Sequence, residues 1–295
     1  MDKKPDIYQE IQQVRNFPYV FFPIAVTLGI MMLYHSASAS LFFAMNFDPK
    51  GALAPYIQGI SQLLFMLVPV MLAARFIPIP RSELFRLAEN PRLREILLGL
   101  FGIIGMQFLV SGWAGLQEFL VPDKLLGIYE NLRENIRDLY VTMLGGGTAW
   151  AMIRGLIIGA AIPAIAEELL FRGFLQRTME EKLRPWKAML IAGAIFGLIH
   201  LNPIDVIPLM YIGFYLGFFA YYTKSIIVPI ILHFANNALA IVVINVPELE
   251  QMDQATPDLP PSYSLAFFFG GLTVTIGVMR MIARRGIKNP SPSED

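Results

Sequence analysis

The sequence Ala166-Glu167-Glu168-Leu169-Leu170-Phe171-Arg172 lies within a long apolar run, residues 149–175, where it places two adjacent carboxylates and an arginine. Charged side chains are costly inside a membrane, so they usually face a protein interior and serve a function. Two later apolar segments each carry a histidine: Phe196-Gly-Leu-Ile-His200 and His233-Phe-Ala-Asn-Asn237. The fold and the function therefore depend on whether these three segments meet.

The composition is that of a membrane protein. Hydrophobic residues make up 55% of the 295 residues and charged residues 16%, whereas a soluble domain carries about 25% charged residues. A membrane-spanning helix needs about 20 mainly apolar residues, and this rule predicts about eight spans: 18–36, 56–75, 96–118, 148–170, 188–202, 206–223, 226–246 and 263–282. The fifth is short and ends at Asn202-Pro203, so it need not cross fully. We therefore expect an all-α, polytopic transmembrane helical bundle.

The cationic residues orient these spans. Every lysine and arginine falls on the side of the two termini, except Lys50, Lys124, Arg133, Arg137 and Arg154. Lysine and arginine concentrate in cytoplasmic loops of membrane proteins. We therefore expect both termini to be cytoplasmic.

One external segment has a different pattern. Within residues 123–140, apolar residues recur at helical spacing, at Leu125, Ile128, Leu132, Ile136 and Leu139. This pattern predicts one external amphipathic helix, lying on the outer membrane surface. A lid or a partner-binding element is the alternative interpretation.

The expected depths of the polar residues in the membrane indicate that the three polar segments meet. At a rise of about 1.5 Å per residue, Glu167, His200 and His233 fall between the inner leaflet and the midplane. We therefore expect one cavity that faces the cytoplasm. His35 falls at the outer end of the first span, and a structural role away from this cavity is expected for it.

Helical phase separates the two carboxylates. Glu168 and Arg172 are four residues apart and can pair on one helix face. Glu167 is turned about 100° away and has no nearby cation in the sequence, which suits a general base. We assign Glu167 to the chemistry and the Glu168–Arg172 pair to its support.

The histidine segments show the same four-residue spacing. Phe196 can pack beside the ring of His200, and His233 shares a helix face with Asn237. An imidazole and an amide that point the same way are suitable donors to an oxyanion. Each feature also has a structural explanation, because histidine and asparagine often form hydrogen bonds between membrane helices. A non-catalytic scaffold and a proton-coupled carrier are therefore alternatives to an enzyme.

The sequence lacks the residues that several other catalytic mechanisms need. The chain contains no cysteine, no Gly-x-Ser-x-Gly, no His-Glu-x-x-His and no Gly-rich phosphate loop. Its net charge is zero, which gives no reason to expect a nucleic-acid partner. The remaining set of one glutamate, two histidines and one asparagine is able to activate water and stabilise an oxyanion without a covalent intermediate.

In order and spacing, Glu167-Glu168-x-x-x-Arg172, Phe196-x-x-x-His200 and His233-x-x-x-Asn237 resemble the three motifs of the CPBP intramembrane proteases. This family includes CAAX prenyl proteases and bacterial relatives linked to bacteriocin processing or immunity. The resemblance covers residues 148–246. It implies a glutamate-type endopeptidase of a bacterial plasma membrane, with the active site facing the cytoplasm and a peptide or membrane-protein substrate.

The resemblance also implies roles for the residues. Glu167 and His200 would activate water, His233 and Asn237 would form the oxyanion hole, and Glu168, Arg172 and Phe196 would support them. No cofactor is expected, although Glu167, His200 and His233 offer a zinc site as an alternative. An immunity-type factor without proteolysis is the other alternative.

We expect one integral-membrane domain in three parts. Residues 1–147 hold three spans and the amphipathic helix, residues 148–246 form the protease-like core, and residues 247–295 hold an external loop, the last span and a cytoplasmic tail.

Overall fold

The computed structural model describes residues 16–44, 51, 53–254 and 260–286. These residues form helices and connecting turns, with no strand among them. The following cations that served to orient the chain lie outside the described residues: Lys3, Lys4, Arg15, Lys50 and Lys288.

Seven helices in the described residues are long and apolar enough to cross a membrane. Five of them are uninterrupted α-helices: α2 (Phe21–Ala44), α6 (Leu93–Leu120), α12 (Val206–Thr223), α13 (Ile227–Asn245) and α15 (Pro261–Gly286). A further helix, α11 (Pro185–Ile199), is apolar but shorter. The all-α polytopic bundle is thus confirmed, and the protein is a multi-pass membrane protein.

Two spans contain π-helical turns. The second span consists of α3 (Ala54–Gln62), η1 (Leu63–Leu67), α4 (Val68–Ala73) and η2 (Ala74–Phe76). The fourth consists of α8 (Ala149–Gly155), η3 (Leu156–Ala161), α9 (Ile162–Glu168), η4 (Leu169–Gln176) and α10 (Arg177–Met179). The π-helical segments η1, η3 and η4 are unusual, and such turns often occur at functional sites.

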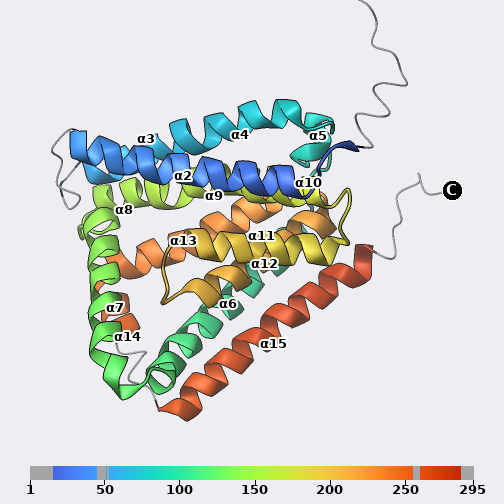
Figure 1. Cartoon of the computed structure of the whole chain (residues 1–295). Coiled ribbons are helices and arrows are strands. Elements are labelled where there is room, and N and C mark those ends of the chain that lie inside the picture. Colours follow the sequence, from blue (N-terminus) through green and yellow to red (C-terminus); the bar gives the residue numbers. More distant parts are fainter. Residues whose placement is uncertain (1–15, 45–50, 52, 255–259, 287–295) are drawn as a thin grey trace, which may run out of the picture.

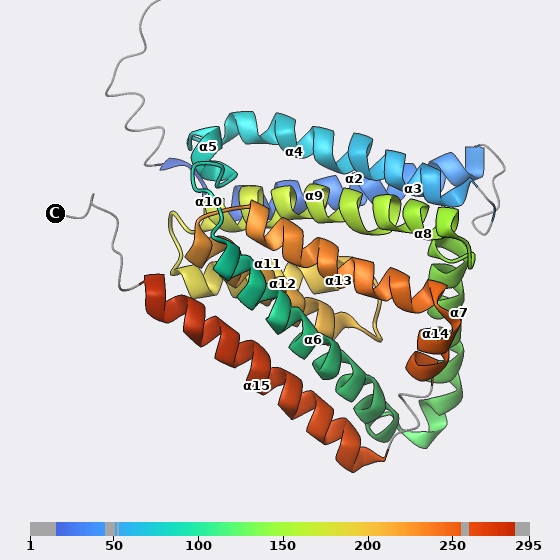
Figure 2. The same ribbon diagram turned by 180° about the vertical axis from the view of Figure 1, so that it is seen from behind.

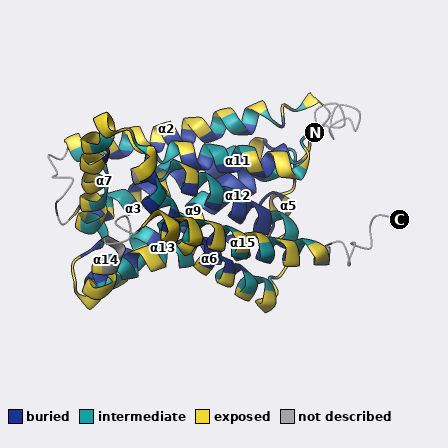
Figure 3. Ribbon diagram, turned by 90° about the horizontal axis from the view of Figure 1, so that it is seen from below, coloured by how far each residue is buried: buried dark blue, intermediate teal, exposed yellow. Residues whose placement is uncertain are grey.

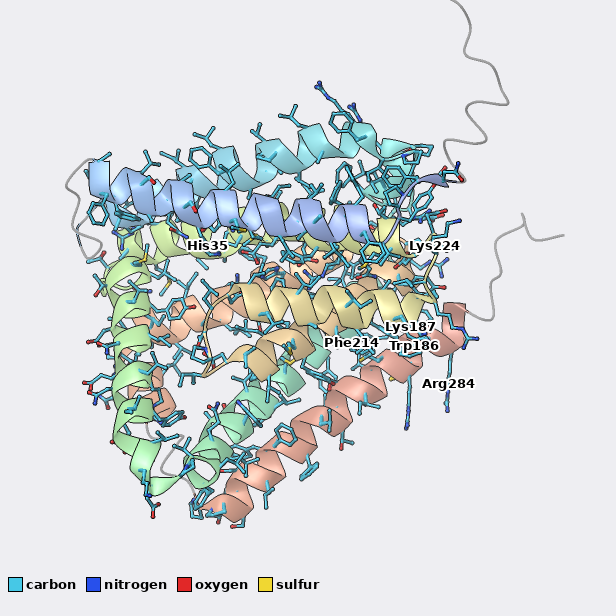
Figure 4. All side chains as sticks on the ribbon, viewed as in Figure 1. His35, Trp186, Lys187, Phe214, Lys224 and Arg284 are labelled. Atoms are coloured by element: carbon cyan, nitrogen blue, oxygen red, sulfur yellow. The ribbon has the colours of Figure 1, made fainter. Side chains whose placement is uncertain are left out.

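The ends of the spans form two opposite ends of the molecule (Figures 1 and 2). At one end, α7 (Asp123–Leu144) runs across the spans and lies near α14 (Pro247–Gln254). Arg137 of α7 and Glu250 of α14 form an ion pair of 2.6 Å. We call this the α7 end. The opposite end carries Lys187, Lys224 and Arg284 (Figure 4), and we call it the cationic end.

The tightly packed core extends toward the cationic end. In η4, every residue from Leu170 to Gln176 is buried, and so are the residues of α12 from Tyr215 to Ala220. α5 (Arg81–Leu84) covers this region, because Leu84 and Phe85 are buried and Arg86 pairs with Glu180 at 2.6 Å. Figure 3 shows buried residues along α11 and α12, whereas α7 is largely exposed.

α11 and α12 approach closely because glycines face each other between them. A Cβ atom on Gly193 would lie 2.7 Å from the backbone N of Phe214, and one on Gly213 would lie 2.8 Å from the Cα of Gly193. Such distances leave no room for a side chain. The close approach also brings the carbonyl of Gly213 within reach of Arg172.

We expect Gly193→Ala to lower the free energy of unfolding by about 1–3 kcal/mol, because the added methyl group overpacks the α11–α12 contact. Gly277→Ala is the matched control, since nothing lies within 4 Å of a Cβ atom there and alanine favours a helix over glycine. Reversible unfolding of the purified proteins in detergent measures both. Equal stability of the two variants would contradict the close packing.

Candidate active site

A buried charge network surrounds Glu168. Its Oε1 lies 2.9 Å from Arg172 Nη1 and 2.8 Å from His233 Nδ1. The guanidinium donates from Nη2 to the carbonyl of Gly213 at 3.1 Å, and its carbon lies 4.7 Å from the centre of the Phe196 ring. Glu168 is 0% exposed and Arg172 1%. The Glu168–Arg172 pair expected from the four-residue spacing is therefore present, and it also fixes the ring of His233.

Glu167 lies at the meeting point of three segments. Its Oε2 is 3.9 Å from Nε2 of His200 and 3.9 Å from Nε2 of His233. Its Oε1 accepts a hydrogen bond of 2.9 Å from Gln62 Nε2 of α3. Glu167 Oε2 is itself buried and receives no hydrogen bond from the described residues. A separation of 3.9 Å is too long for a direct hydrogen bond and suits one bridging water molecule.

The hydrogen bonds of the two imidazoles assign their protons. His200 Nδ1 is 2.6 Å from the carbonyl of Phe196, and His233 Nδ1 is 2.8 Å from the carboxylate of Glu168. Each acceptor requires a proton on Nδ1, which leaves Nε2 of a neutral ring as an acceptor. His233 Nε2 therefore donates a hydrogen bond only when the ring carries a second proton, beside the negative charge of Glu168.

Asn237 is oriented by a row of amides. Gln107 Nε2 of α6 donates to Asn236 Oδ1 at 3.0 Å, and Asn236 Nδ2 donates to Asn237 Oδ1 at 3.3 Å. Asn237 Nδ2 donates to the carbonyl of Gly159 at 3.3 Å. Pro163 has no N–H to give that carbonyl the usual helical hydrogen bond. One N–H of Asn237 thus holds the amide to η3, and the second makes no hydrogen bond to the described residues.

Comparison with known proteins identifies the segment that holds these residues. Residues 148–239 match the family described as type II CAAX prenyl endopeptidase Rce1-like. The chain carries an Rce1-like segment. The comparison confirms the family suggested by the three motifs, over less than half of the chain, and it supports an intramembrane endopeptidase at the level of the family. No curated protein and no solved structure matched the chain.

The Rce1-like segment contains every residue that the sequence proposed for the site. Glu167, His200 and His233 converge on one point, and Asn237 lies one helical turn beyond His233 on α13. Phe196 packs against both imidazoles, with ring centres 4.6 Å from His200 and 5.8 Å from His233.

The zinc alternative finds no support in the arrangement of donors. Within the part of the chain that the structure describes, no group of three or more histidine, aspartate or glutamate side chains is placed to hold a metal ion. The mechanism proposed for this site therefore has no step at a metal ion.

Three residues beside the site lie outside the Rce1-like segment, and the sequence did not lead us to assign them to the site. Gln62 contacts Glu167, and Gln107 contacts Asn236. His35 was expected at the outer end of its span, but its Nε2 lies 3.3 Å from the carbonyl of Ile199, next to His200. The expectation was wrong because α2 continues beyond His35 to Ala44, so His35 does not lie at the end of its span.

Proposed function

We propose that this protein is an intramembrane endopeptidase of the plasma membrane, in which Glu167 and His200 activate a water molecule for hydrolysis of a peptide bond. The observation that supports this proposal is the position of Glu167 Oε2, 3.9 Å from Nε2 of both His200 and His233. A water molecule between these atoms has a base to take its proton and an imidazole nitrogen to orient it.

Glu167 Oε2 takes one proton from the water as the water oxygen attacks the carbonyl carbon of the substrate. The C–O bond forms, and the electron pair of the carbonyl moves onto its oxygen. The free N–H of Asn237 and Nε2–H of protonated His233 donate to this oxyanion. When the C–N bond breaks, the amine leaving group receives the proton held by Glu167, so no covalent intermediate forms.

Glu168 has a supporting role in this mechanism. Its carboxylate accepts a hydrogen bond of 2.8 Å from Nδ1 of His233 and so orients the ring with Nε2 toward Glu167. Arg172 holds Glu168 in place and prevents an unpaired buried charge. The mechanism as proposed needs no metal or organic cofactor.

The test is cleavage of a library of membrane peptides by the purified protein, with and without a chelator. We expect cleavage by the wild-type protein in both conditions, and none by His200→Ala purified in the same way. Equal cleavage by the two proteins would point to a contaminant and end the proposal. Loss of activity in the chelator, with recovery on adding zinc, would contradict the metal-free mechanism.

Gln62 is expected to position the base. Gln62→Leu removes the hydrogen bond to Glu167 Oε1, and hydrogen bonds to charged groups contribute about 1.5–3 kcal/mol. We expect kcat to fall by about 10- to 100-fold, with KM nearly unchanged. Gln58→Leu, one turn earlier on α3, is the control, because Gln58 contacts Tyr34 rather than Glu167. Equal effects of the two substitutions on kcat would contradict the positioning role.

A further inference from the structure

The end of α11 has a backbone carbonyl that its own helix does not satisfy. The last carbonyls of a helix have no intrahelical donor, and Ile199 is the last residue of α11. The residue four positions further along is Pro203, which has no N–H to donate. Leu201 has a φ of 51° and turns the chain away, and its N–H donates to the carbonyl of Leu198 instead. The carbonyl of Ile199 therefore needs a donor from elsewhere in the protein.

His35 of α2 supplies this donor. Its Nε2 lies 3.3 Å from the carbonyl oxygen of Ile199. Because a carbonyl oxygen can only accept, this ring nitrogen carries a proton. The ring also contacts the buried ring of Tyr34, with centres 5.0 Å apart. Figure 4 shows His35 on α2, near the end of α11. His35 thus joins α2 to the last turn of α11.

The peptide group that His35 contacts also contains the backbone nitrogen of His200. A peptide group is planar, so a donor that holds the carbonyl of Ile199 also holds the N–H of His200. The imidazole of His200 is held separately, because its Nδ1 lies 2.6 Å from the carbonyl of Phe196. Its Nε2 lies 3.9 Å from Glu167 Oε2. One contact on the backbone and one on the ring therefore orient His200 toward the candidate base.

The helices α2 and α3 together reach both residues of the water-activating pair. α2 packs against α3, and Gln62 of α3 donates to Glu167 Oε1 at 2.9 Å. One donor from this helix pair thus holds Glu167, and the other holds the peptide group of His200. Both helices lie outside the Rce1-like segment, residues 148–239. The separation between Glu167 and His200 therefore depends on helices outside the segment that contains them.

We propose that His35 is a positioning residue for peptide-bond hydrolysis, because it holds the peptide group of His200 and so keeps Nε2 of that ring beside the water at Glu167. His35 does not touch the reacting atoms and acts through His200. The effect of His35 on the rate rests on the proposed endopeptidase function. Its effect on the orientation of His200 does not, so the two effects are measured separately.

The first measurement is the rate of peptide cleavage by variants of the full-length protein. His35→Leu removes the donor, whereas His35→Gln keeps an N–H near the place of Nε2. We expect kcat of His35→Leu to fall about 10-fold with KM nearly unchanged, because misplacing a catalytic group slows the chemical step. His35→Gln should recover most of this loss. Equal losses in His35→Leu and His35→Gln, or no loss in His35→Leu, would overturn the proposal.

The matched control is Ser36→Leu, which introduces leucine at the next position of α2. Both His35 and Ser36 are exposed, so neither substitution opens a cavity in the core. Ser36→Leu should cleave at the wild-type rate. If it lowers kcat as much as His35→Leu does, the cause is a changed surface of α2 and the positioning role is wrong.

The second measurement observes the imidazoles directly and needs no activity. The chain contains three histidines, so protein labelled with ¹⁵N-histidine gives magnetic-resonance signals from three rings, which His35→Leu and His200→Ala assign. We expect His35→Leu to shift the His200 signals and to leave those of His233 in place, since Glu168 holds His233 Nδ1 at 2.8 Å. His35→Gln should keep the wild-type signals of both rings. Unchanged His200 signals in His35→Leu would overturn the proposal. If the wild-type protein cleaves no peptide, the endopeptidase proposal has failed, and the His200 signals still decide whether His35 positions that ring.

Discussion

Glu167→Gln is expected to reduce peptide-bond cleavage by about 10²- to 10⁴-fold, the usual contribution of a general base. Glutamine has nearly the same shape as glutamate, and its carbonyl oxygen can still accept from Gln62 Nε2, so the packing around α9 is preserved. What is lost is the ability to take a proton at Oε2, the atom 3.9 Å from both imidazoles. The rate is measured on a membrane peptide that the wild-type protein cleaves.

The matched control is Glu134→Gln, which makes the same substitution at an exposed position of α7. It is expected to retain wild-type activity. Thermal unfolding of Glu167→Gln should remain at the wild-type temperature, so that the lost activity is not a loss of folded protein. If Glu167→Gln retained more than about a tenth of the wild-type activity, the loss would be too small for a general base. Glu167 would then not have that role.

Hydropathy was sufficient to predict the bundle. Each long helix depends on a run of apolar residues that only a membrane or a buried core accommodates, and Pro203 correctly indicated that α11 is short. The ends of the helices were less accurate. The first span was expected to end at residue 36, whereas α2 continues through small residues and Phe43 to Ala44. This error in the end of the first span is the reason why His35 was expected to lie away from the site.

The site was predictable where its contacts are local. Glu168 and Arg172 pair because they are four residues apart on one helix, and Phe196 contacts His200 for the same reason. The contact between Glu168 and His233 joins residues far apart in the sequence, and only helix packing brings it about. The family motifs placed both residues in one site, but neither the motifs nor the spacing predicted this contact.

The glutamines had no signal in the sequence. Gln62 and Gln107 lie in apolar helices, where an amide more often joins two helices than supports a catalytic group. Their partners, Glu167 and Asn236, become evident only when α3 and α6 are placed against the Rce1-like segment.

Arg172→Leu is expected to destabilise the protein by about 3–5 kcal/mol, because it leaves a buried carboxylate without its cation. Glu168 is 0% exposed, and Arg172 is the largest fully buried side chain of the described residues. The guanidinium also holds the carbonyl of Gly213 and lies over the ring of Phe196. Unfolding of the purified variant in mixed detergent micelles measures the loss. A free energy of unfolding within about 1 kcal/mol of wild type would contradict the ion pair as a structural support.

The double variant Glu168→Leu/Arg172→Leu separates folding from positioning. Replacing both members of a buried pair by apolar residues of similar size is often neutral or stabilising, so we expect the double variant to recover most of the stability lost in Arg172→Leu. Activity should remain absent, because His233 Nδ1 has lost the carboxylate at 2.8 Å that orients the ring in the proposed mechanism. A stable double variant with wild-type activity would show that Glu168 supports only the fold, and the donation from His233 to the oxyanion would then need another source.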